Sequence, residues 1–173
     1  YSTGDTMILC DLMTRMLTDS NNPDLRRDAM MEFVRGRLMA PSGLSSLTPE
    51  FDPRGTMIGG AMMHMTARDY TRFGELLRNQ GRVNGHQLLS ARWVAFMTSP
   101  SKRNPAYGGH LWLNREGAEN PLFPGRASSR LYAAVGHHGQ YLLISPAQRL
   151  VVLRMGISTQ EEKIPLRAAL AHL

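Results

Sequence analysis

Two adjacent histidines in a glycine-framed polar segment are the residues of this chain best suited to chemistry. The segment Gly136–Gln140, GHHGQ, lies between two apolar, β-rich runs at residues 131–135 and 141–144. This pattern predicts an antiparallel strand pair in which a backbone N–H could stabilise an oxyanion while an imidazole donates a hydrogen bond. A β-bulge with exposed histidines explains the same residues equally well.

A tyrosine before a predicted helix is the second candidate. Tyr1–Thr3 precedes Met7–Leu17, whose apolar residues recur at helical spacing, with Asp5 or Thr6 as the expected N-cap. A tyrosine held on such a loop could act as a general base if nearby cations lowered the pKa of its phenol. An ordinary tyrosine at a helix entrance fits the same pattern.

A third conspicuous segment, Ile58–Asp69, is expected to hold a loop rather than to carry chemistry. It contains the pair Gly59-Gly60 and then Thr66, a plausible N-cap with Asp69 at the third helical position. This is a variant of the capping box, which marks a helix start.

The elements that must position these residues change character near residue 107. Helices are predicted over 24–38, with Leu25, Met30 and Val34 on the apolar face, from Thr66 to about Gly81, and over 91–97 after the cap Ser90. A tight turn is predicted at Val83–His86, around Asn84-Gly85. Strands are predicted over 107–114, 131–135, 141–144 and 150–153, and residues 168–173 indicate the start of a C-terminal helix. We predict an α+β fold. We expect residues 1–106 to form a mainly helical region with a pocket-rimming loop at 44–60, and residues 107–173 to form the antiparallel sheet portion, within one incomplete structural domain.

The composition is that of a globular protein with excess positive charge. The 173 residues include 20 Lys and Arg against 14 Asp and Glu, a net charge of +6. Because the basic residues are scattered, they indicate a solvated surface rather than a nucleic-acid partner. No apolar run approaches the length of about 20 residues that a membrane span needs.

Cysteine and histidine spacing gives no support to a metal centre. Cys10 is the single cysteine and lies among apolar neighbours, so we expect a buried thiol. On a regular strand His137 and His138 would point to opposite faces and could not chelate one ion. The remaining histidines show no HxxxH or HExxH spacing, so no metal site is predicted.

Taken together, these motifs resemble those of the serine β-lactamase-related superfamily, in particular its class C-like esterases and 6-aminohexanoate-dimer hydrolases. Tyr1–Thr3 resembles the family's Tyr-x-Asn motif, with threonine in place of asparagine, which weakens any expectation of β-lactam recognition. Residues 49–79 resemble the stretch leading into a helix that reads T-A-R-D-x-x-R-F-G. Residues 134–156 resemble the strand pair that carries Lys-Thr-Gly, which the esterases replace by His-x-Gly.

The resemblance implies a β-lactamase/transpeptidase-like fold and acyl transfer to water through an acyl-serine, with no metal or organic cofactor. Tyr1 would shuttle the proton, His137 would orient the substrate or support that transfer, and the Gln140 N–H would bind the oxyanion. A register shift by one residue would give the lead role to Gly136 or His138. The other implied substrate-binding or oxyanion positions are Thr3, Gly136, His138 and Gly139. The expected partner is a small ester, amide or lactam.

The implied nucleophile is not found where the family has it. Its Ser-x-x-Lys motif precedes the tyrosine, whereas this chain shows the pattern only at Ser99–Lys102, at a helix end. We interpret that match as coincidence. We expect the chain to be the C-terminal portion of a larger enzyme, inactive by itself, whose N-terminal part supplies the serine and the lysine.

The rival hypothesis is a penicillin-binding-protein-like binding module that has lost catalysis. The enzyme hypothesis expects Tyr1 and the histidine pair to meet across one cleft. The substrate, the oligomeric state and the compartment, periplasm or cytoplasm of a bacterium, are left open by the sequence.

Overall fold

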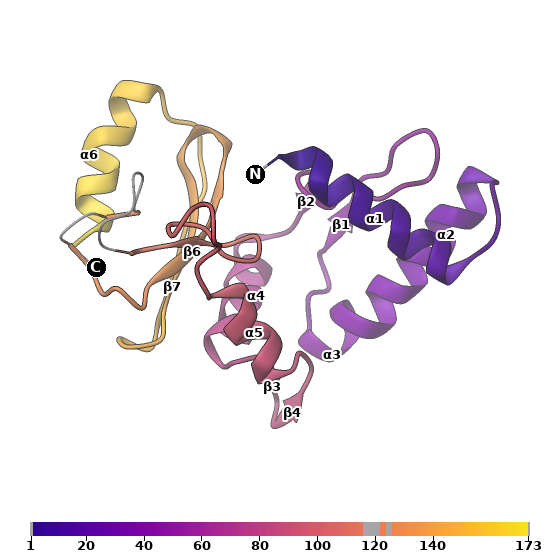
Figure 1. Ribbon diagram of the computed structural model, residues 1–173, viewed down its shortest axis with the longest axis horizontal. Coiled ribbons are helices and arrows are strands. Elements are labelled where there is room, and N and C mark those ends of the chain that lie inside the picture. Colours follow the sequence, from indigo (N-terminus) through magenta and orange to yellow (C-terminus); the bar gives the residue numbers. More distant parts are fainter. Residues whose placement is uncertain (1, 116–121, 124–125, 173) are drawn as a thin grey trace. The chain divides into compact units, whose positions relative to one another are not determined.

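The computed structural model describes residues 2–115, 122–123 and 126–172 (Figure 1). Its contacts separate two compact units, Tyr1–Asp69 and Tyr70–Leu173, each of which is described by itself. The boundary suggested by periodicity, between residues 106 and 107, lies inside the second unit.

The first helix begins at Thr3, earlier than predicted. In α1 (Thr3–Leu17) the hydroxyl of the N-cap, Ser2, accepts a hydrogen bond from the Asp5 N–H at 3.3 Å, and the Asp5 carboxylate accepts from the Ser2 N–H at 3.1 Å. This reciprocal capping box satisfies two backbone donors at once. The predicted caps, Asp5 and Thr6, are therefore wrong, because Asp5 belongs to the first turn.

α1 buries a different face from the one its large apolar residues suggest. Cys10 and Thr14 are buried, while Leu12 and Met16 are 54% and 79% exposed. The Thr14 hydroxyl donates to the Cys10 carbonyl at 2.8 Å, so it is satisfied within the helix. The expected buried thiol is confirmed.

α2 (Pro23–Val34) starts at Asn22, whose side chain accepts from two backbone N–H groups. It continues through a π-helical turn (Arg35–Met39) and α3 (Ala40–Ser42) and ends at Gly43. Met30 and Val34 are buried as predicted, but Leu25 is 56% exposed and Arg26 takes the buried position beside it.

The loop after α3 is held to α2 by close backbone contact. β1 (Thr48–Pro49) pairs antiparallel with β2 (Met63–His64). Between them one Asp52 carboxylate oxygen accepts from the Arg54 and Thr56 N–H groups at 2.9 and 2.8 Å. Gly55 lies so close to α2 that an added Cβ would be 2.2 Å from the Pro23 carbonyl oxygen.

The helix and turn signals at the start of the second unit are confirmed. α4 (Ala67–Arg78), which begins at the end of the first unit, buries Leu76 and Leu77, and α5 (Ala91–Met97) occupies the predicted span. The Asn84-Gly85 turn, with φ of 49° and 81°, joins β3 (Arg82–Val83) to β4 (His86–Gln87). Positive φ at both central residues is typical of tight hairpins.

A four-stranded antiparallel sheet, in the order β5-β6-β7-β8, forms the centre of the second unit. β6 (Tyr132–Gly136), β7 (Gln140–Ser145) and β8 (Leu150–Arg154) agree with the predicted strands. β5 is only Trp112–Leu113, because the chain before it turns back: the Gly108 N–H donates to the Leu111 carbonyl and the Gly109 N–H to that of Met97.

Alternating side chains of the sheet fill two cores. On one face Tyr141 and Leu143 pack with residues 122–123 and with α6 (Gln160–Leu170), which lies beside the sheet in Figure 1. On the other face Leu142 and Ile144 pack with α4. Period-two alternation places successive residues on opposite faces, so each strand serves both cores.

The C-terminal helix starts at Gln160 rather than at residue 168. A capping box between Thr159 and Glu162 sets its beginning, and its last turn ends at a C-cap, Ala171. None of the helices within the described residues has the length and apolar character that a membrane span needs.

Candidate active site

The five residues of the GHHGQ segment lie together at the connection between β6 and β7. Gly136 pairs with Gln140, and His137–Gly139 form the short turn between them. His138 has φ 57° and Gly139 has φ 80°, so the chain turns through two consecutive left-handed residues. Left-handed backbone is uncommon for residues other than glycine, although histidine is enriched there.

The two imidazoles lie side by side, which corrects the prediction that they point to opposite faces. Their ring centroids are 3.9 Å apart with an interplanar angle of 60°. The prediction assumed a regular strand, whereas both histidines sit in the turn. Both are exposed. Within the described part of the chain, no group of three or more His, Cys, Asp or Glu side chains is placed to hold a metal ion.

The carbonyl groups of the turn are held by the segment that follows β8. The His138 carbonyl accepts from the Ser158 N–H at 2.9 Å, and the Gly139 carbonyl accepts from Arg154 Nη1 at 2.9 Å. The Gln140 side chain donates to the His137 carbonyl at 3.3 Å. These bonds fix the backbone of the turn while leaving the imidazoles at the surface.

Gly139 is the buried residue of the turn because α6 packs behind it. A Cβ added there would lie 3.3 Å from Leu166 Cδ2 and 3.5 Å from Lys163 Cγ. Close approach and positive φ together explain a glycine at this position.

The other predicted site residues are Tyr1 and Thr3. Tyr1 lies outside the described residues. Ser2 is the N-cap, and Thr3 is the exposed first residue of the helix. The meeting of Tyr1 with the histidine pair stays a prediction.

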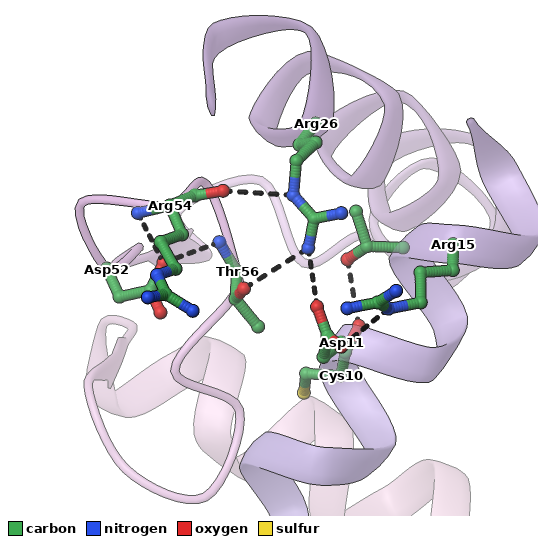
Figure 2. Close-up of polar contacts among 8 residues, drawn as sticks. Cys10, Asp11, Arg15, Arg26, Asp52, Arg54 and Thr56 are labelled. Atoms are coloured by element: carbon green, nitrogen blue, oxygen red, sulfur yellow. Dashed lines mark hydrogen bonds and ion pairs between the residues drawn. The ribbon is translucent and has the colours of Figure 1, made fainter. Parts of the chain in front are cut away.

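The position of α1 depends on one buried guanidinium, that of Arg26 on α2 (Figure 2). Its Nη2 donates to Asp11 Oδ1 at 2.6 Å, and its Nε donates to the Arg54 carbonyl at 2.9 Å. A longer bond of 3.4 Å reaches the Thr56 hydroxyl. Arg26 thus joins α1, α2 and the 52–56 turn, a role that the predicted apolar face of α2 did not reveal.

Asp11 is shared between two arginines. Arg15 Nε donates to its second oxygen at 2.7 Å, and this bond, with that from Arg26, lowers the pKa of the Asp11 carboxyl below its usual value. Beside the pair lies a hollow of about 570 Å³, lined by parts of α1, the start of α2 and the 52–56 turn.

The Gly59-Gly60 pair lets its loop approach α1, as expected for a structural segment. A Cβ at Gly59 would lie 2.7 Å from the Cys10 sulfur, and one at Gly60 would lie 3.1 Å from Thr3 and Thr6 side-chain carbons. Burial raises the pKa of the Cys10 thiol, while a backbone hydrogen bond from Gly59 opposes that rise.

Asp69 contributes to the helix cap and also binds Ser46 in the loop after α3. Its N–H donates to the Thr66 hydroxyl at 3.4 Å, but its buried carboxylate accepts from the Ser46 N–H at 2.8 Å and the Ser46 hydroxyl at 2.6 Å. The cap signal is therefore present, and the acid also holds the loop after α3.

The Ser99–Lys102 pattern does not begin a helix. Ser99 follows the end of α5, and its exposed hydroxyl donates to the Ala95 carbonyl at 2.7 Å. This placement differs from the helix start at which the family carries its nucleophile.

Residues 11–172 match the family model described as Beta-lactamase, and the chain therefore belongs to the Beta-lactamase family. Its helices and antiparallel sheets form a β-lactamase/transpeptidase-like fold, the fold of a hydrolase-type domain. Among curated protein sequences, none matches this chain.

The solved structures that are similar to this chain include three of longer chains. One described as a 6-aminohexanoate-dimer hydrolase from Bacillus anthracis has a TM-score of 0.69 and 22% identity, covering 99% of this chain and 42% of its own. A second, described as a beta-lactamase from Bacteroides dorei, has a TM-score of 0.55 and 13% identity, and the match covers 84% of this chain and 53% of that one. A penicillin-binding protein homologue from Caulobacter crescentus has a TM-score of 0.54 and 16% identity, and the match covers 81% of this chain and 52% of that one. At these identities the similarity shows the fold alone.

Proposed function

We propose that this chain is the C-terminal part of a serine hydrolase that cleaves ester or amide bonds through an acyl-serine intermediate. The observation that carries the proposal is the family match over residues 11–172. The chain spans 42% of the similar 6-aminohexanoate-dimer hydrolase, so we assign the serine and lysine of the family motif to a part of the protein outside these residues.

In the proposed reaction the serine oxygen attacks the substrate carbonyl carbon, and its proton passes to Tyr1, which acts with the lysine. The bond to the leaving group then breaks as the proton returns to that group. Water hydrolyses the acyl-serine by the same route. The Gln140 N–H would donate to the tetrahedral oxyanion, an interaction that contributes about 3 to 4 kcal/mol for each such donor.

The geometry of the β6–β7 turn supports its part in this proposal. Its carbonyl groups are engaged by Arg154 and Ser158, so its backbone is held before a substrate arrives. Within the described residues neither imidazole has a hydrogen-bond partner, so His137 is available to orient a substrate, and we place His138 and Thr3 among the substrate-binding residues. Pre-organised donors are the usual source of oxyanion stabilisation.

Labelling with a fluorophosphonate probe tests the proposal directly. The natural protein that contains this chain should be labelled on one serine outside residues 1–173, with a lysine three positions later, and should hydrolyse p-nitrophenyl butyrate. The isolated chain should do neither. A natural protein that is not labelled and shows no turnover would support the binding-module hypothesis, and a label on Ser99 would overturn the assignment of the nucleophile.

Tyr1→Phe separates the proposed base from the rest of the machinery. In the natural protein we expect kcat for the ester to fall by about a hundredfold or more, as when a general base is removed. Tyr107→Phe is the matched control, since that ring packs edge-on against Trp112 in the second unit and should leave turnover unchanged. Equal rates for wild type and Tyr1→Phe would remove Tyr1 from the mechanism.

A further inference from the structure

One arginine at the end of β8 ties the His137–Gly139 turn to the segment that leads into α6. Arg154 Nη1 donates to the Gly139 and Gly156 carbonyls, both at 2.9 Å, with a longer contact of 3.4 Å to the His138 carbonyl. Its Nη2 donates to the Ser158 hydroxyl at 2.8 Å. A guanidinium can make these bonds together because its donors form a rigid planar fork.

Two glycines lie against the guanidinium. An added Cβ at Gly139 or at Gly156 would lie 3.5 Å from the nearest atom of the Arg154 guanidinium, which is ordinary van der Waals contact. Within the described residues no carboxylate forms an ion pair with Arg154. Its positive charge is therefore directed at peptide carbonyls.

The bond to Gly139 involves the peptide group whose N–H is the proposed oxyanion donor. The Gly139 carbonyl and the Gln140 N–H belong to the same peptide. A cationic donor on the carbonyl oxygen makes a bond roughly twice as strong as a neutral one and polarises the group to which it is bound. The Gln140 N–H therefore becomes a better donor, and its direction is fixed.

The same arginine supports the strained part of the turn. His138 is held at φ 57°, and its carbonyl accepts from both the Ser158 N–H and Arg154. A left-handed residue other than glycine persists when its surroundings determine its conformation. Here those surroundings are residues 154–158.

We infer that Arg154 is a positioning residue, which fixes and polarises the His137–Gln140 backbone without touching the substrate. The inference rests on the proposed function for its catalytic consequence, but the structural part stands apart from it. Nothing in the local sequence marks this arginine. Gly156 and Ser158 are near it in the chain, but the carbonyls of His138 and Gly139 become its neighbours only when β7 and β8 pair.

Amide hydrogen exchange of the 173-residue chain tests the structural part. In Arg154→Met the Ser158 amide, which donates to the turn, should exchange about tenfold faster or more, while the amides of Leu142 and Leu153, paired between β7 and β8, keep their protection. Arg130→Met, at an exposed arginine of the same unit, should change none of them. If Arg154→Met loosens the whole sheet, the exchange rate of the Ser158 amide is measured in Arg154→Lys instead. Lysine keeps the positive charge and the aliphatic part of the side chain but lacks the planar guanidinium. Unchanged exchange at Ser158 in both variants overturns the inference.

Kinetics of the natural protein on p-nitrophenyl butyrate test the catalytic part. Arg154→Met should lower kcat by about tenfold or more with KM changed less than about twofold, and Arg154→Lys should recover part of the loss. A variant with altered Ser158 exchange and wild-type kcat overturns the role in catalysis. If the wild-type protein shows no turnover, the result counts against the proposed function. The hydrogen-exchange data then test the positioning role of Arg154 by themselves.

Discussion

Replacing Gly139 with alanine should destabilise the second unit more than the same change at Gly85. The two glycines have nearly the same positive φ, 80° and 81°. An alanine in this conformation costs about 1 to 2 kcal/mol. At Gly85 no atom lies within 4 Å of an added Cβ, whereas at Gly139 the nearest, Leu166 Cδ2, would be 3.3 Å away. Such crowding adds about 1 kcal/mol. We therefore expect a loss of about 1 to 2 kcal/mol at Gly85 and about 2 to 3 kcal/mol at Gly139.

Urea unfolding followed by tryptophan fluorescence measures this difference. Both tryptophans of the chain, Trp93 and Trp112, lie in the second unit, so the signal reports on that unit. The shared backbone strain cancels when the two variants are compared, and the remainder measures the contact between the turn and α6. Equal losses in unfolding free energy would refute the packing of Leu166 against the turn, and a smaller loss at Gly139 would refute it more strongly.

The remaining predictions concern buried polar groups of the second unit. Asn114→Ala should lower the unfolding free energy by about 2 to 3 kcal/mol in the same assay, because the buried Asn114 amide accepts from the Phe123 N–H at 2.9 Å and donates to carbonyls of the 126–128 segment. Exposed Asn79→Ala should change it by less than about 0.5 kcal/mol, and similar effects would contradict the role of burial. Burial raises the pKa of Tyr132 to about 12, opposed by the nearby Arg78 cation. Its contribution to stability is therefore complete below the unfolded pKa of about 10 and is lost as pH rises through 12. Tyr132→Phe should make that alkaline loss shallower, and an unchanged profile would assign the loss to another group.

Local chemistry allowed much of the fold to be predicted. The Ser90 cap, the Asn84-Gly85 turn and the alternation in the last strands act over a few residues, and each is confirmed. α6 could have been found in the same way, since Thr159 and Glu162 form a capping box that is visible in the sequence. Periodicity failed where apolar residues do not face the core, as on α1, where Cys10 and Thr14 are buried and Met16 is exposed.

The sequence by itself determined which residues belong to the candidate turn, the strands around it and the family resemblance that the comparison confirmed. Only the tertiary structure decided that the two imidazoles lie side by side and that Arg154 holds the peptide between Gly139 and Gln140. The physical reason is range: caps, turns and alternation depend on neighbours in the chain, whereas a guanidinium among carbonyl groups depends on strand pairing that brings distant residues together.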